Sequence, residues 1–90
     1  MENILDQMAH YGVIPVIAID DPHHAVPLAR ALLEGGLPFA EITFRTAAAE
    51  QSIRSIAAEV PQMIVGAGSV ANVATAERAL AAGARFIVSA

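Results

Sequence analysis

The sequence predicts an α/β protein built around a parallel sheet of about four strands. Short, continuous apolar runs alternate with alanine-rich segments of helical length along the chain. Continuous apolar runs are typical of strands buried on both faces of a parallel sheet, and their alternation with helices is typical of βαβ units. Ninety residues allow one domain at most, so we expect a single unit over residues 1–90.

The first two expected elements are a helix and a strand. Residues 3–10 carry apolar side chains at helical spacing, and Gly12 follows them as a stop signal. Residues 13–19 are a β-branched run of strand length. Pro15 lies inside this run and has no N–H to donate, so it indicates a sheet edge or a bulge.

The next two expected elements are also a helix and a strand. Asp21 and Pro22 predict a helix start, because an acidic N-cap is followed by proline at the first helical position. This helix ends at the glycine pair 35–36, and Pro27 near its start predicts irregular first turns. Residues 39–44 then form the second strand.

The third helix and the third strand have clear boundary residues. We expect Thr46 to cap a helix over residues 47–59, and Pro61 follows this helix as a stop signal. Residues 63–66 form the third strand. This strand is expected to run into a loop at residues 67–69.

The last helix and strand complete the pattern. Asn72 caps a helix that ends at Gly83, and residues 85–89 form the fourth strand. Four strands with three intervening helices fit either half of a (β/α)8 barrel or a small doubly wound sheet. Periodicity alone does not choose between these two folds.

One strand carries polar side chains that are unusual for a parallel sheet. Strand alternation places Glu41 and Arg45 on one side of the strand over residues 39–44, while the opposite side is apolar and would pack on helices. A carboxylate in such a position is costly unless it is paired or takes part in proton transfer. Two interpretations remain open: a general acid or base, or a structural Glu41–Arg45 pair.

Two further groups of residues invite a functional interpretation. Gly66 and Gly68 precede Ser69 at the expected strand end, where glycines let backbone N–H groups approach an anion and the serine adds a hydroxyl. The same glycines could serve turn geometry alone. His23 and His24 are consecutive in a first helical turn and point in different directions, so we assign them to a solvated surface and expect no metal site.

Composition excludes several classes of function. The net charge of -4 leaves no basic stripe for nucleic acid. The mean hydropathy is +0.54, yet no apolar run approaches the ~20 residues that span a bilayer. The absence of cysteine excludes disulfides, thiolate metal sites and a cysteine nucleophile. No secretory leader is recognisable, so we expect a cytoplasmic protein.

Taken together, five sequence blocks resemble the bacterial keto-hydroxyglutarate / keto-deoxy-phosphogluconate aldolases. They follow one another in the family's order and spacing and cover essentially the whole chain. The E-I-T-F-R-T and G-A-G-S-V blocks are specific in combination. The five blocks are Val13–Ile17, Ala31–Gly36, Glu41–Thr46, Val65–Val70 and Ala82–Ser89.

This resemblance implies a (β/α)8 barrel, usually trimeric, that cleaves a 2-keto-3-deoxy or 4-hydroxy acid to pyruvate and an aldehyde without a cofactor. Glu41 matches the family's proton-shuttling carboxylate, and Arg45 matches the arginine that binds the substrate carboxylate. Ser69 stands where the family usually has threonine and contacts the same pyruvyl end. The resemblance thus makes Glu41 the catalytic residue, and Arg45 and Ser69 the substrate-binding residues.

The resemblance also implies a nucleophile that this sequence does not contain. The family forms its Schiff base on a lysine of the sixth strand, whereas all five cationic residues here are arginines. We therefore expect residues 1–90 to be a partial domain, the N-terminal half of the barrel, and to be inactive alone. The alternative is a non-catalytic half-barrel that acts as a scaffold or association module.

Overall fold

The computed structural model describes residue 12 and residues 14–89. One four-stranded parallel sheet forms, with the strands in the order β1-β2-β3-β4. Its strands are β1 (Val16–Ile17), β2 (Phe39–Thr43), β3 (Ile64–Val70) and β4 (Ile87–Ser89). Its helices are the 3-10 turn η1 (Pro22–His24), α2 (Ala25–Glu34), α3 (Ala49–Glu59) and α4 (Val73–Ala82). The helix expected over residues 3–10 lies outside the described residues.

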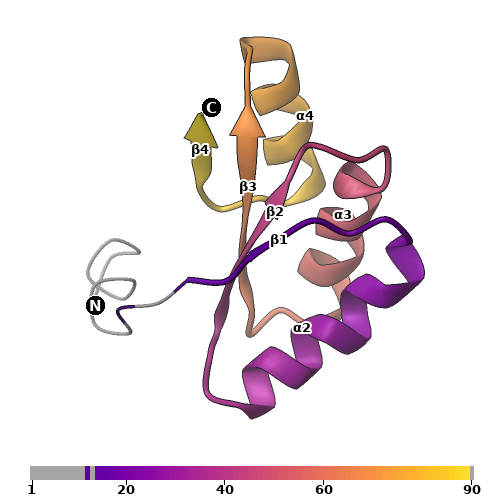
Figure 1. Cartoon of the computed structure of the whole chain (residues 1–90), viewed down its shortest axis with the longest axis vertical. Coiled ribbons are helices and arrows are strands. Elements are labelled where there is room, and N and C mark those ends of the chain that lie inside the picture. The colour runs from indigo at the N-terminus through magenta and orange to yellow at the C-terminus, as the bar shows by residue number, and fades with distance from the viewer. Residues whose placement is uncertain (1–11, 13, 90) are drawn as a thin grey trace.

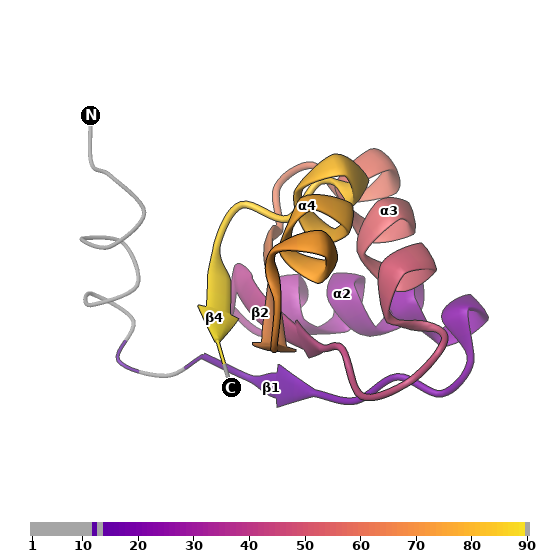
Figure 2. The same cartoon turned by 90° about the horizontal axis from the view of Figure 1, so that it is seen from above.

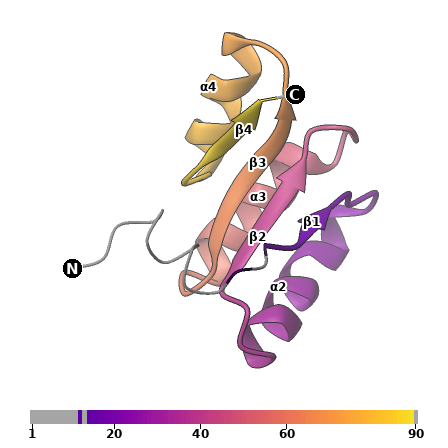
Figure 3. The same cartoon turned by 60° about the vertical axis from the view of Figure 1, so that its left-hand side comes forward.

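All three α-helices lie on one face of the sheet, and no described element covers the other face (Figures 1 and 2). The strands follow one another across the sheet in sequence order (Figure 3). A doubly wound sheet has helices on both faces, so that alternative is wrong. Helices on one side of sequentially ordered parallel strands are the arrangement of a barrel segment. None of the described helices is long and apolar enough to cross a membrane.

The core lies between the sheet and α3. Ile53 and Ile56 of α3 are fully buried against residues of β2 and β3 that point toward the helices. Alanines on the three helices let the helix backbones approach the sheet closely. The helix-facing strand residues are Ala40, Ile42, Val65 and Ala67, and the buried helix alanines are Ala25, Ala29, Ala49, Ala79 and Ala82. The other face of β2 is therefore free to carry Glu41.

The first described strand is shorter than the sequence predicts. β1 has two residues in place of the expected 13–19, of which Val13 lies outside the described residues. Pro15 nevertheless takes part in the sheet, because its carbonyl accepts a hydrogen bond of 2.9 Å from the Glu41 N–H. β1 lies at the edge of the described sheet, as the proline predicted.

The start of the second helix is capped as predicted but is not a regular α-helix. The Asp21 carboxylate accepts a hydrogen bond of 3.0 Å from the His23 N–H. It thereby caps η1, which leads into α2. Pro27 lies in the first turn of α2, where its missing N–H would have no helical acceptor. The expected irregular first turns are confirmed.

The prediction that Thr46 caps the third helix is wrong. This helix begins at Ala49, and its N-cap Ala48 has no side-chain cap. The Thr46 hydroxyl instead donates to the Ile19 carbonyl at 2.5 Å. A buried carbonyl beyond the end of the short strand β1 needs a donor, and Thr46 supplies it across the sheet.

The boundaries of the last helix are confirmed. The Asn72 side chain accepts a hydrogen bond of 2.8 Å from the Thr75 N–H, as expected of an N-cap. Gly83 ends the helix with φ 116°, the left-handed conformation that favours glycine. Residues 84–86 then lead into β4, which lies beside β3 and begins two residues later than the expected strand over residues 85–89.

Candidate active site

A cavity of about 420 Å³ opens on the face of the sheet that the helices leave uncovered. It lies toward the carboxyl ends of the strands, where barrel enzymes place their active sites. Glu41, Arg45 and Ser69 all line this cavity, so the structure brings together the three residues predicted from the sequence. The remaining lining residues are Val16, Ala18, Thr43, Val88 and Ser89.

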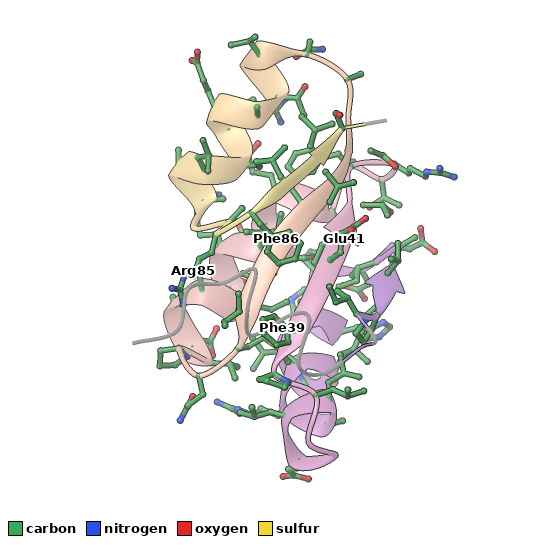
Figure 4. All side chains as sticks on the ribbon, turned by 90° about the vertical axis from the view of Figure 1, so that its left-hand side faces the viewer. Phe39, Glu41, Arg85 and Phe86 are labelled. Carbon is green, nitrogen blue, oxygen red and sulfur yellow. The ribbon has the colours of Figure 1, made fainter. Side chains whose placement is uncertain are left out.

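Glu41 projects from β2 away from the helices (Figure 4). Its neighbours in the strand, Ala40 and Ile42, pack in the core on the opposite side. Among the described residues no ion pair joins Glu41 to Arg45, and the Glu41 carboxylate has no hydrogen-bond partner there. The structural Glu41–Arg45 pair is therefore not formed, and the carboxylate remains free to contact a ligand.

Arg45 and Ser69 form the polar end of the cavity. Arg45 lies two residues beyond β2, and its Nε donates a hydrogen bond of 3.1 Å to the Ser69 Oγ. A guanidinium has five N–H donors in a planar fork. The Nη groups of Arg45 have no acceptor among the described residues, so they can take a carboxylate in bidentate fashion.

Ser69 reaches the cavity because the regular alternation of side chains between the two faces of the sheet is broken just before it. Val65 and Ala67 face the helices, so regular alternation would turn residue 69 the same way. Ser69 instead has φ 55°, and the β3–β4 register shifts between Ala67 and Val70. This irregularity aims Ser69 at the cavity and returns Val70 to the core. Non-glycine residues in this conformation cluster at functional sites.

The predicted loop around the two glycines is absent. β3 continues to Val70, so Gly66 and Gly68 both lie inside the strand, and neither has positive φ. The turn-geometry interpretation is therefore wrong. The space that their missing side chains leave is filled by neighbouring side chains, the Phe86 ring beside Gly66 and the Glu41 carboxylate beside Gly68.

Sequence reasoning did not single out the other residues that line the cavity. Thr43 is buried beside Glu41, and its hydroxyl donates to the Ile17 carbonyl at 3.5 Å. Strand alternation places Thr43 on the same side as Glu41, and this could have indicated that Thr43 lines the cavity. Val88 and Ser89 come from β4, the strand beside β3. Their position near the carboxyl end of a parallel strand was the signal that could have identified them as cavity residues.

Two charge clusters lie outside the cavity. Hydrogen bonds from the backbone N–H and then the side chain of His23 lower the pKa of Asp21. Hydrogen bonds from Arg78 and then Arg54 lower the pKa of Glu50, which thereby links α3 to α4. The Asp21 cluster occupies an exposed helix start. Among the described residues no group of three carboxylate, histidine or cysteine side chains could hold a metal ion.

The fold and the cavity define the class of protein. Parallel strands with helices on one face, and polar side chains gathered at the carboxyl ends of the strands, are the arrangement of a (β/α)8 barrel. The family model described as KDPG and KHG aldolase matches residues 4–90. The chain belongs to this aldolase family, and the resemblance in its sequence blocks is confirmed.

Individual relatives agree with this assignment. The 2-dehydro-3-deoxy-phosphogluconate aldolase of Pseudoalteromonas atlantica is 51% identical over 84 residues, which are 93% of this chain and 39% of that protein. The structure of the 2-keto-3-deoxy-6-phosphogluconate aldolase of Zymomonas mobilis with 3-phosphoglycerate is similar with a TM-score of 0.79. It is 45% identical, over 84% of this chain and 36% of that one.

A second solved structure is the KDPG aldolase of Legionella pneumophila, with pyruvate captured as a covalent carbinolamine intermediate. It has a TM-score of 0.81 and 39% identity, over 84% of this chain and 37% of that one. The chain thus spans about two fifths of the length of these relatives. Its fold is the first half of the (β/α)8 barrel.

Proposed function

We propose that this chain forms the pyruvate-binding half of a class I aldolase. The enzyme would cleave 2-keto-3-deoxy-6-phosphogluconate or 4-hydroxy-2-oxoglutarate to pyruvate and an aldehyde. One observation carries the proposal: a carboxylate with no partner among the described residues, a guanidinium and a hydroxyl line a single cavity in a chain of the aldolase family. The proposed setting is a cytoplasmic homo-oligomer, a trimer as the family resemblance implies.

Arg45 and Ser69 are the proposed binding site for the carboxylate of the keto acid. The hydrogen bond from Arg45 Nε to Ser69 Oγ holds the two side chains together before a ligand arrives. This arrangement leaves the Nη groups for two parallel charge-assisted hydrogen bonds. The hydroxyl proton of Ser69 can point to the same anion, because its oxygen is the acceptor in the bond from Arg45.

Glu41 is the proposed proton carrier. A Schiff-base aldolase must move protons when an amine adds to the keto carbon, when water leaves, and when the carbon–carbon bond breaks. The Glu41 carboxylate lies in the same cavity as Arg45 and Ser69 and can reach atoms next to a carboxylate that they hold. General acid–base catalysis of this kind contributes about 10² to 10⁴ in rate.

The nucleophile is proposed to come from outside these 90 residues. Their sequence contains no lysine, and the resemblance assigns the Schiff-base lysine to the sixth strand. A non-catalytic half-barrel that serves as a scaffold or association module is the second candidate. It is favoured by the sheet face that no described element covers, where Val16 and Val88 of the outer described strands are 63% and 42% exposed.

The test is kinetic and uses the protein in the form that its own gene encodes. Pyruvate release from each keto acid is coupled to lactate dehydrogenase. Glu41→Gln is expected to lower kcat about 10² to 10⁴-fold. Glu34→Gln, the same chemical change at the exposed end of α2, is the matched control and should leave kcat unchanged. No pyruvate release from either substrate by the unmodified protein would contradict the proposed function.

A further inference from the structure

The position of the Glu41 carboxylate along the sheet is set by the strand next to it. In the β2–β3 register Glu41 lies opposite Gly66, and Thr43 lies opposite Gly68. A glutamate that extended straight across the sheet would place its carboxylate beside Gly66. The carboxylate lies beside Gly68 instead, which is two residues further toward the carboxyl ends of the strands. Ser69 is the next residue in the chain.

The space at Gly66 is already occupied. A Cβ atom at residue 66 would lie 2.5 Å from the Cδ2 atom of Phe86 and closer still to other atoms of its ring. Figure 4 shows Phe86 and Glu41 on the same side of the sheet, opposite the helices. The phenylalanine ring therefore blocks the position level with Glu41, and the Glu41 side chain is left with the space further along β3.

The space at Gly68 is the one that Glu41 takes. A Cβ atom at residue 68 would lie 2.7 Å from the Glu41 Cδ and 2.9 Å from its Cγ, and nearer still to Oε2. Real Cβ atoms essentially never approach another atom so closely. The absence of a side chain at residue 68 is thus what lets the carboxylate lie against the backbone of β3.

We propose that Gly68 is a positioning residue, which places the Glu41 carboxylate next to the binding site formed by Arg45 and Ser69. The expected loss of kcat rests on the proposed aldolase function, whereas the expected displacement of the Glu41 carboxylate does not. In this role Gly68 acts through Glu41. Phe86, which fills the space at Gly66, excludes the alternative position.

Gly68→Ala tests this directly. The Glu41 Cδ must move from 2.7 Å to an ordinary contact distance of 3.4 Å or more, and Oε2 must move further. The displaced group is the end of a flexible side chain with no hydrogen-bond partner among the described residues. We therefore expect the fold to be retained. A misplacement of this size is expected to lower kcat about 100-fold, while KM changes little because Arg45 and Ser69 remain.

Three measurements make the test decisive. A crystal structure of Gly68→Ala should show the carboxylate displaced, whether or not the protein is active. In the Glu41→Gln background, Gly68→Ala should lower kcat no further, because the group that Gly68 positions is already gone. Gly66→Ala is the matched control. Its added methyl displaces the Phe86 ring but itself fills the position level with Glu41, so it should lower the melting temperature more than Gly68→Ala does and lower kcat less.

The outcomes separate the two proposals. An unmoved carboxylate in Gly68→Ala would overturn the positioning role, and so would a kcat loss that is additive with Glu41→Gln. If the unmodified protein releases no pyruvate, the proposed function fails. The crystal structure of Gly68→Ala still decides whether residue 68 sets the position of Glu41.

Discussion

Two glycines with positive φ let backbone strain be measured separately from steric overlap. Gly36 has φ 88° and a Cβ added there would meet nothing within 4 Å, whereas Gly83 has φ 116° and its added Cβ would lie 2.5 Å from the Ala57 Cβ. Gly83 joins α4 to the segment that leads into β4, the strand whose Val88 lines the cavity. Both glycines follow a helix end, so alanine imposes the same kind of backbone cost at each.

The expected magnitudes follow from these distances. Alanine with positive φ costs about 1 to 2 kcal/mol, and this is the whole cost for Gly36→Ala. Gly83→Ala adds an overlap with α3 of the kind that costs about 1 to 3 kcal/mol. A domain of this size has a free energy of unfolding of about 5 to 13 kcal/mol, so Gly83→Ala removes a large part of it.

The assay is thermal unfolding followed by circular dichroism at one protein concentration, so that association contributes equally to each variant. Gly36→Ala should lower Tm by about 4 to 8 °C per kcal/mol, and Gly83→Ala by clearly more. Ala57→Gly in the Gly83→Ala background should recover part of the loss, with a coupling of about 0.5 to 3 kcal/mol. Equal decreases in Tm for the two glycine variants, or no coupling between residues 83 and 57, would refute the overlap between a Cβ at residue 83 and the Ala57 Cβ.

Four further predictions address stability, association and reactivity. Ser52→Ala should raise the free energy of unfolding by about 1 kcal/mol, because the buried Ser52 Oγ has no hydrogen-bond partner in the described part of the chain. A lower free energy of unfolding for this variant in urea would show that the hydroxyl is hydrogen-bonded in the native protein. Hydrogen bonds from Arg78 and Arg54 lower the pKa of Glu50 below its ordinary value of 4.5, so their stabilisation should be present above that pH and lost as pH falls through the lowered pKa. Glu50→Gln should remove this acid-dependent part of the Tm profile, and an unchanged profile would contradict the assignment. The isolated 90-residue polypeptide should associate through the sheet face that no described element covers. Borohydride with pyruvate should label no internal residue of this polypeptide, because it contains no lysine. A monomer of 9.3 kDa by light scattering, or an internal adduct, would contradict these two expectations.

The sequence predicted the elements whose ends are marked by local chemistry. Asn72 and Gly83 act within one turn of their own helix, through a side-chain cap and a left-handed residue. The face of β2 that carries Glu41 followed from alternation alone, because Ala40 and Ile42 could pack only against helices. Local signals of this kind do not depend on the rest of the fold.

The features that the sequence did not predict depend on contacts across the sheet. Thr46 has the residue type of a helix cap, but its hydroxyl is taken by the Ile19 carbonyl, 27 residues away in the chain. Ser69 enters the cavity through a register shift that depends on β4. Gly68 had two local interpretations, and neither included a carboxylate from the neighbouring strand. Tertiary contacts decided all three.

The central claim is that Glu41, Arg45 and Ser69 together bind the pyruvyl end of a keto acid. The most direct measurement is a crystal structure of the gene-encoded protein after pyruvate has been trapped on it. We expect the pyruvate carboxylate within hydrogen-bond distance of Arg45 and Ser69. A Glu41 carboxylate oxygen should lie within about 3.2 Å of an atom bonded to the former keto carbon. Pyruvate bound away from Arg45, or a Glu41 carboxylate out of hydrogen-bond reach of it, would contradict the claim.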